Sequence, residues 1–197
     1  AHFPILFRRD LESGTLSAVA LFGFANGENL FLEAGHWDAA YKPLAQAVQP
    51  FLIGRSSDGS RPPQVHVDMG SPRLIHEGNE GVALFDEAGQ PSPWLDSIAQ
   101  RLGDLDAAFQ ASADFFAALE RHALLEPFTL DVPLVDGTRN SLVGFHIIDE
   151  ERLRALDAVA LDELHRAGHL MPLFMAVASI AQFNELVARK NRRVAGG

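Results

Sequence analysis

Short apolar runs separated by polar turns dominate the first 90 residues of the chain. Runs of this length, bounded by turn residues, are typical of β-strands. Asn26-Gly27 stands between two of them and predicts a hairpin, because both residues tolerate positive φ. We therefore expect a strand-rich segment over residues 1–90, built from FPILF, LSAVALFGF, NLFLE, PFLIG, QVHVDMG and GVALFDEAGQP.

The pattern becomes helical at Ser92-Pro93. Serine is a good N-cap, and proline is well suited to the first helical position. Apolar residues then recur at alternating steps of three and four, which places them on one face of a helix. This pattern predicts a helix over residues 93–121 whose buried stripe consists of Leu95, Ile98, Leu102, Leu105, Phe109, Phe116 and Leu119.

A second hairpin and a helical segment complete the predicted fold. Two alternating runs over residues 128–147 meet around Asp136-Gly137, which indicates a hairpin. Capping and stop residues then indicate helices over residues 150–192. We predict a single α+β domain over residues 1–197, in which a curved antiparallel sheet packs against one long central helix and a C-terminal helical segment.

Composition narrows the classes of partner. The chain carries 26 acidic and 16 basic side chains, a net charge of −10, so we expect no nucleic-acid partner. No run of about 20 apolar residues predicts a membrane span. The one basic cluster, residues 189–193, ends a helix, where cations complement the helix dipole. A docking patch is the alternative interpretation of that cluster.

The chain has no cysteine, which excludes disulfides, thiolate zinc sites and thiol nucleophiles. We see no targeting segment; the compartment stays open, and the cytoplasm is favoured. The sequence opens at Ala1-His2-Phe3-Pro4, already inside a segment with strand character. We therefore expect the natural protein to begin earlier.

The most specific chemical pattern is His66-Val67-Asp68 together with His146. Alternate residues of a strand share one face, so His66 and Asp68 could act as two ligands of one metal. With His146 they would form the facial triad of a non-haem iron oxygenase. The alternative is structural: His66 lies at a strand end and Asp68 starts the turn that follows.

The stretch GENLFLEAGHWDAAYKPLAQAVQPFLIG offers a second candidate site. Trp37 and Tyr41 are four residues apart and can pin this loop to the sheet or line a small-molecule pocket. Glu33, His36 and Asp38 are possible acid, base or ligand groups beside them.

The last predicted helix carries polar residues among apolar ones. Ser179, Gln182 and Asn184 need hydrogen-bond partners if they are buried. They could bridge to neighbouring backbone or face a pocket. The second possibility makes Gln182 and Asn184 candidate binding residues with Trp37 and Tyr41. The chain contains no GxGxxG motif after a strand, no GxxxxGK[ST] and no GxSxG, so nucleotide-phosphate and nucleophile-elbow fingerprints are missing.

Several stretches together resemble the bacterial SapC family. They are FPILFRRD, VALFGFANGENLFLEAGHWDAAYKP, QPFLIGR, EGVALFDEAGQPSPWLD, LLEPFTLDVPL, EERLRALDAVALDELHRAGHL and ASIAQFNELVARKNRR. The resemblance implies association with a surface-layer locus, from which the family takes its name, and no defined reaction. It does not require His66 or His146, which argues against a shared role for them.

Three functions remain as expectations. The first is a non-catalytic binding or assembly module without a cofactor, which would have a protein partner or form a homo-oligomer. The second is a non-haem iron (2-oxoglutarate-type) oxygenase-like enzyme that holds Fe2+ through His66, Asp68 and His146. The third is a small-molecule carrier that uses Trp37, Tyr41, Gln182 and Asn184. Without a catalytic fingerprint, the first is favoured over an enzyme.

Overall fold

The computed structural model describes residues 2–56, 58, 60–75 and 81–196. The chain forms two compact units, one from Ala1–Tyr41 with Ala113–Gly197 and the other from Lys42–Ser112. Helices and antiparallel strands are mixed, which confirms the α+β class. The single-domain organisation stays a prediction. Ala1, on which the expectation of an earlier start was based, lies outside the described residues.

A four-stranded antiparallel sheet forms the centre of the first unit. Its order is β2-β1-β8-β7, so the first strand lies between its hairpin neighbour and a strand from late in the chain. Phe7 faces Ala18 on one side and His146 on the other. The sheet therefore joins the first two apolar runs to the late hairpin. Its strands are β1 (Ile5–Arg9), β2 (Leu16–Ala20), β7 (Leu125–Pro133) and β8 (Arg139–Ile148).

Both faces of β1 are buried. Leu6 and Phe7 have 0% and 1% of their surface exposed, and successive strand residues point to opposite faces. Leu6 belongs to an apolar cluster with Phe31, Leu142 and Phe183, among others. Phe7 belongs to a second cluster that includes Leu119, Leu124, Leu164 and Leu173. Burial on both faces at Leu6 and Phe7 explains why the run FPILF is apolar without alternation, whereas Arg8 and Arg9 at the end of β1 are exposed.

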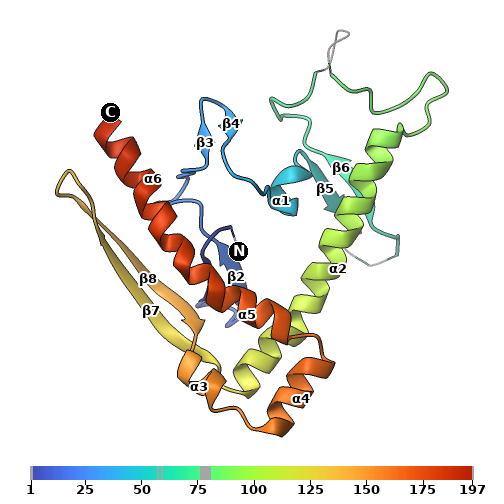
Figure 1. Ribbon diagram of the computed structural model, residues 1–197. Coiled ribbons are helices and arrows are strands. Elements are labelled where there is room, and N and C mark those ends of the chain that lie inside the picture. The colour runs from blue at the N-terminus through green and yellow to red at the C-terminus, as the bar shows by residue number, and fades with distance from the viewer. Residues whose placement is uncertain (1, 57, 59, 76–80, 197) are drawn as a thin grey trace. The chain divides into compact units, whose positions relative to one another are not determined.

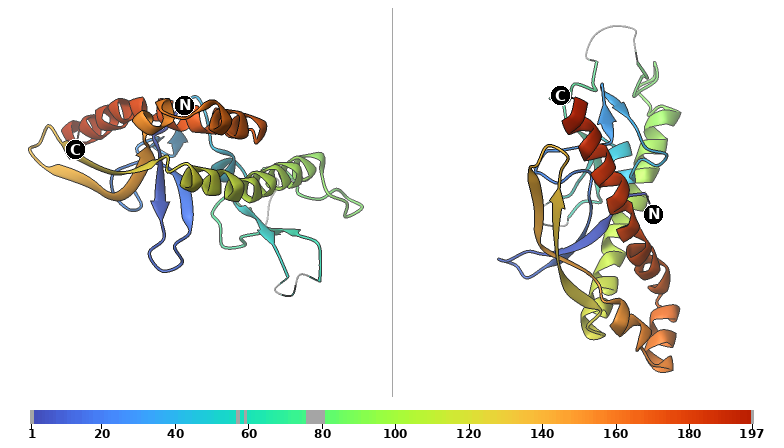
Figure 2. Two further views of the ribbon diagram at one scale, coloured as in Figure 1. Left: turned by 90° about the horizontal axis from the view of Figure 1, so that it is seen from below. Right: turned by 60° about the vertical axis from the view of Figure 1, so that its left-hand side comes forward.

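Five helical segments complete the first unit. Asp149 and Asp157 cap the first two of them, each accepting a hydrogen bond from a backbone N–H three residues on. The last three follow one another as a long helical rod beside the sheet (Figures 1 and 2). The segments are α3 (Glu150–Arg154), α4 (Ala158–Arg166), α5 (Leu170–Ser179), the 3-10 helix η1 (Ile180–Gln182) and α6 (Phe183–Gly196).

The second unit is built on the first part of the long helix α2 (Pro93–Arg121). Val48, Phe51, Ile98 and Leu102 form its buried core. The other elements are α1 (Leu44–Ala47) and the antiparallel pair β5 (Phe51–Gly54) and β6 (Gln64–Val67).

The bounds of α2 confirm the predicted helix. The prediction that Phe109 belongs to its buried stripe is wrong. Phe109 has 79% of its surface exposed. The stripe from Leu95 to Leu105 packs in the core of the second unit. The residues from Phe115 to Leu119 pack in the first unit. Phe109 lies between these two segments and belongs to neither core.

Two strand predictions in the first half are also wrong. Asn26-Gly27 forms a turn, in which the N–H of Glu28 donates to the carbonyl oxygen of Ala25, but no pair of described strands flanks it. Instead, β3 (Leu32–Glu33) pairs with β4 (His36–Trp37). Residues 81–91 contain only a single bridge, between Phe85 and Pro91. For the first of these, the reason is that Phe31 of NLFLE lies in a loop, where its side chain is buried in the core, and not in a paired strand.

Candidate functional site

Trp37 is an anchor for its loop. Its ring lies 5.5 Å from Phe22, 5.9 Å from Phe3 and 6.1 Å from Phe31, measured between ring centroids. Its Nε1 donates a hydrogen bond of 3.0 Å to the carbonyl oxygen of Tyr41. Aromatic packing and this hydrogen bond together fix the loop against the first unit's core. The structure thus favours the anchoring interpretation of this residue.

The other residues of the predicted carrier site are at or near the surface. Tyr41 is exposed and stacks on His2, with ring centroids 5.3 Å apart. Gln182 is half-buried in η1, and Asn184 is exposed at the start of α6. Among the described residues, neither of these amide side chains makes a hydrogen bond to Trp37 or Tyr41. A pocket formed by all four residues stays a prediction.

Ser179 is the polar residue of the last helices that needed a partner. It is fully buried. Its Oγ accepts a hydrogen bond of 2.9 Å from the N–H of Ile5 and donates one of 2.6 Å to the carbonyl oxygen of Ala176. This bridging to backbone is one of the two roles expected from the sequence, and it ties α5 to β1.

The basic cluster at the end of α6 binds residues 29–38, which include the β3–β4 hairpin. Arg189 pairs with Asp38 at 2.8 Å, and its guanidinium carbon lies 4.5 Å from the ring centroid of Phe31. Arg193 donates to the carbonyl oxygens of Asn29 and Leu32, at 3.1 and 3.0 Å. These contacts are intramolecular, so the cluster has a structural role beyond complementing the helix dipole. We call this set of contacts the C-terminal clamp.

A partly buried ion pair completes the C-terminal clamp. The Nζ atom of Lys190 lies 2.6 Å from Oε1 of Glu28, and these side chains are 18% and 13% exposed. The other carboxylate oxygen accepts a hydrogen bond from the N–H of Phe24. Burial alone would raise the pKa of Glu28, but Lys190 and the Phe24 N–H hold the pKa below its ordinary value.

The carboxylates and imidazole of the β3–β4 hairpin lie at the surface. Glu33 and His36 face each other across its two strands, and both are exposed. Asp38 is held by Arg189. Glu33 and Asp38 line a groove of about 560 Å³ with the arginines of the C-terminal clamp. Asp38 therefore pairs with a guanidinium group, and Glu33 and His36 are exposed rather than part of a buried reaction centre.

The three residues of the predicted iron site fall in different units. Asp68 starts a turn: its Oδ1 accepts a hydrogen bond of 3.0 Å from the N–H of Gly70, and its carbonyl oxygen accepts one from Ser71. His66 and Asp68 belong to the second unit and His146 to the first. Within the described chain, no group of three or more His, Asp or Glu residues could hold a metal ion. The iron site stays a prediction.

His146 lies in a shallow hollow of the first unit. It pairs with Phe7 and Pro127 in the sheet. Its Nδ1 atom is buried and makes no hydrogen bond to a described residue. The hollow, of about 310 Å³, also contains the ion pair between Arg9 and Glu120, whose charged atoms are 2.5 Å apart.

The structure exposes an apolar surface that the sequence argument missed. Met171, Phe174 and Met175 of α5 have 71%, 51% and 37% of their surface exposed. They are spaced i, i+3 and i+4, which makes them neighbours on one helix face. Ala178 is exposed one turn further on. We call these four residues the α5 surface. One signal in the sequence could have predicted this surface. LMPLFMAVAS is apolar on every face of its helix, and only one side of a helix can enter a core.

The rod from Leu170 to Gly196 is long and apolar enough by composition to cross a membrane. Only 28% of its most apolar 18-residue stretch is buried. A core helix can have the same length and composition, and here Leu173, Ala176 and Leu186 are buried in the first unit. The length and composition of this rod therefore indicate mainly that much of its apolar surface is exposed.

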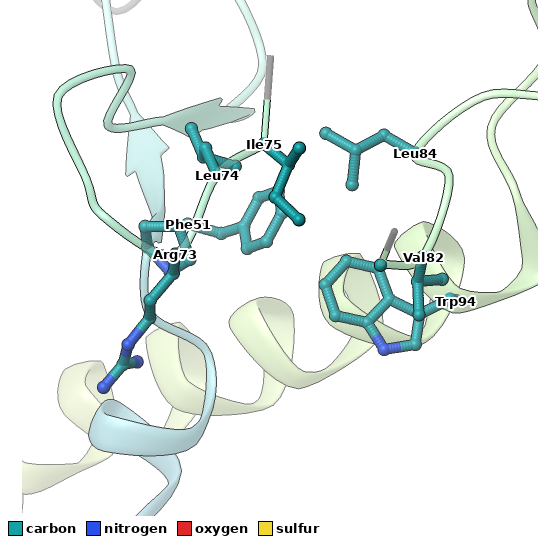
Figure 3. A pocket seen from close by; sticks show the side chains of 9 residues that line it. Phe51, Arg73, Leu74, Ile75, Val82, Leu84 and Trp94 are labelled. Carbon is teal, nitrogen blue, oxygen red and sulfur yellow. The ribbon is translucent and has the colours of Figure 1, made fainter. Parts of the chain in front are cut away.

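A small apolar pocket lies in the second unit. Phe51 and Trp94 meet edge to face with ring centroids 5.6 Å apart, and Leu74, Ile75 and Leu84 also line its volume of about 210 Å³ (Figure 3). Arg73 points away from these apolar side chains and donates to the carbonyl oxygen of Gln49 at 3.1 Å.

Comparison with known proteins gives one match. The SapC family pattern covers residues 1–186 of the 197-residue chain. No curated protein matches, and no solved structure matches. The match spans both compact units and includes the anchoring Trp37 loop, the sheet and α5. The chain therefore belongs to the SapC family.

Proposed function

We propose that this protein is a non-catalytic binding or assembly module that docks a protein partner on the α5 surface. The observation that carries the proposal is the exposure of Met171, Phe174 and Met175 on one face of α5. Single exposed apolar residues are common, but adjacent large ones mark interaction sites. Two of the chain's three methionines lie there, and methionine adapts to varied partner surfaces.

Charge and geometry favour an amphipathic, basic helix as the occupant. The α5 surface is a convex strip about two turns long, which suits the apolar face of another helix. The chain carries a net charge of −10, so a partner with basic residues beside its apolar face is attracted to it. The same charge disfavours a second copy of the chain and an anionic bilayer. The surface-layer association implied by the family is compatible with such a docking role and remains part of the proposal.

A synthetic amphipathic helix of leucine and lysine is a direct probe of this surface. We expect it to bind the full chain with roughly micromolar affinity. Replacing Met171, Phe174 and Met175 together by serine should weaken binding by at least about tenfold, because it removes the apolar contact and leaves the charge unchanged. Fluorescence anisotropy of a labelled peptide measures both affinities, and circular dichroism confirms that the variant is folded.

A matched control distinguishes binding at the α5 surface from non-specific binding to exposed apolar residues. Phe109→Ser removes an even more exposed phenylalanine from another helix and should leave the affinity unchanged. A peptide of the same composition with a scrambled, non-amphipathic order should bind weakly. Equal binding by the triple variant and the unmodified chain would refute the proposal. So would a self-association, measured by sedimentation, that only the triple variant abolishes, because the occupant would then be a second copy.

The pocket of the second unit supports a second candidate function, a small-molecule carrier. Its apolar lining by Phe51, Trp94 and Leu84 suits a compact apolar ligand. Its volume is below the usual range for ligand pockets, which runs from about 300 to 1,000 Å³. This makes the carrier the weaker candidate, and it moves the expected site away from Trp37 and Tyr41.

Indole is a suitable probe for that pocket. If the carrier function is correct, indole should raise the thermal unfolding temperature of the full chain by at least about 2 °C, as ligand binding to the folded state requires. Trp94→Ala should remove the shift, whereas Trp37→Phe should keep it. A thermal-shift series with increasing indole makes the measurement. No shift, or a shift that Trp94→Ala preserves, counts against a carrier site in this pocket.

A further inference from the structure

A hollow at the end of the β5–β6 hairpin is lined only by hydrogen-bond donors and small residues. Its polar side chains are Arg55, Ser56, Arg61, Gln64 and His66, and the remaining lining comes from Gly54 and Pro62. No Asp or Glu is among these described lining residues. The donor set is the one that recognises oxyanions.

The position of His66 depends on Gly54. His66 faces Leu52 across the strand pair, and its imidazole reaches over Gly54. A Cβ atom at position 54 would lie 2.3 Å from Nε2 of His66. Glycine therefore lets the imidazole keep this position, and a side chain at position 54 would displace it. The close approach places the imidazole within the hollow that contains both arginines.

The nearby acids are already engaged. Asp106 of α2 pairs with Arg55 and offsets part of its charge. Asp58 accepts hydrogen bonds from the N–H and hydroxyl of Ser60, at 3.0 and 2.7 Å. Arg61 makes no ion pair with any described residue. The hollow therefore keeps one guanidinium whose charge no described carboxylate meets.

We infer that this hollow is a binding site for a small oxyanion, a phosphate or carboxylate group, held by Arg61 and Arg55 with His66 as a further donor. Its volume of about 140 Å³ admits one such group and not a nucleotide. The guanidinium groups meet two oxygens of the anion at once, and the imidazole N–H meets a third. The site is independent of the α5 surface and belongs to the other unit.

Inorganic phosphate and acetate are the probes. At low ionic strength, phosphate titrated into the full chain should shift the backbone amide resonances of residues 54–56, 61 and 64–66 along one saturating curve. Arg61→Gln should weaken the affinity by at least about tenfold. Gly54→Ala should displace His66 and weaken it by about threefold, with both arginines intact. Comparing phosphate with acetate identifies which group the site prefers.

The controls distinguish a built site from general attraction. Arg101→Gln removes an exposed cation from α2 in the same unit and should leave the phosphate affinity unchanged. Shifts spread over the whole surface, or equal weakening by Arg61→Gln and Arg101→Gln, would overturn the inference. So would saturation that Arg61→Gln and Gly54→Ala both leave intact. None of these results bears on peptide binding by α5, so the two proposals fail separately.

Discussion

Leu173→Ala is expected to lower the free energy of unfolding by about 2–5 kcal/mol, the range for a fully buried leucine truncated in a core. Leu173 is 0% exposed and packs in the cluster that contains Phe7 and Leu164. Truncation removes apolar contacts and leaves a cavity that the surrounding residues fill only in part. Urea unfolding followed by circular dichroism measures the change.

The matched substitution lies two residues away. Met171→Ala on the exposed face of α5 should change the free energy of unfolding by no more than about 0.5 kcal/mol. The contrast tests whether one face of α5 enters the core while the other stays free for a partner. Similar losses from both substitutions would mean that the exposed methionine is covered, and the docking proposal would lose its basis.

Glu28→Gln is expected to cost about 2–3 kcal/mol at neutral pH, because it leaves Lys190 without its charge partner in a partly buried site. The glutamate side chain packs tightly there: a Cβ atom at Gly23 would lie 2.7 Å from Cγ of Glu28. Because the clamp fastens residues 28–38 to α6, hydrogen exchange of those residues should also accelerate. Glu12→Gln, on an exposed residue of the β1–β2 turn, is the control.

The same pair predicts a pH dependence with a defined sign. The folded pKa of Glu28 is lowered from its ordinary value of 4.5. Its contribution to stability is therefore complete above that value and is lost as pH falls through the folded pKa. The stability difference between the unmodified chain and Glu28→Gln should be constant from neutral pH to about 5 and shrink below about 4.5. A difference that persists unchanged to pH 3, roughly, would contradict the lowered pKa.

The regular elements with strong local signals could be predicted from the sequence. Helix α2 has both a capping signal at Ser92-Pro93 and a long apolar repeat, and its bounds are as predicted. The late hairpin has alternation and a glycine turn, and β7 and β8 form as expected. These signals are local, because they depend on spacing within one element.

The predictions that were wrong depended on contacts between residues that are distant in the sequence. NLFLE has the composition of a strand, yet Phe31 is needed in a core formed with Phe3 and Phe183, so little of this run pairs. Phe109 continues the repeat of α2 but lies between two separate clusters. The α5 surface was missed because an all-apolar helix gives no indication of which side stays exposed.

The order of strands has a consequence during synthesis. β1 is made long before β8, but it becomes central only when β8 pairs with it, and Phe7 and His146 are 139 positions apart in the chain. Until then the FPILF run lacks its second neighbour and the helices that shield it. Long-range pairing of this kind slows folding and leaves apolar surface exposed to other nascent chains. Newly made protein should therefore depend on chaperones until α6 has left the ribosome.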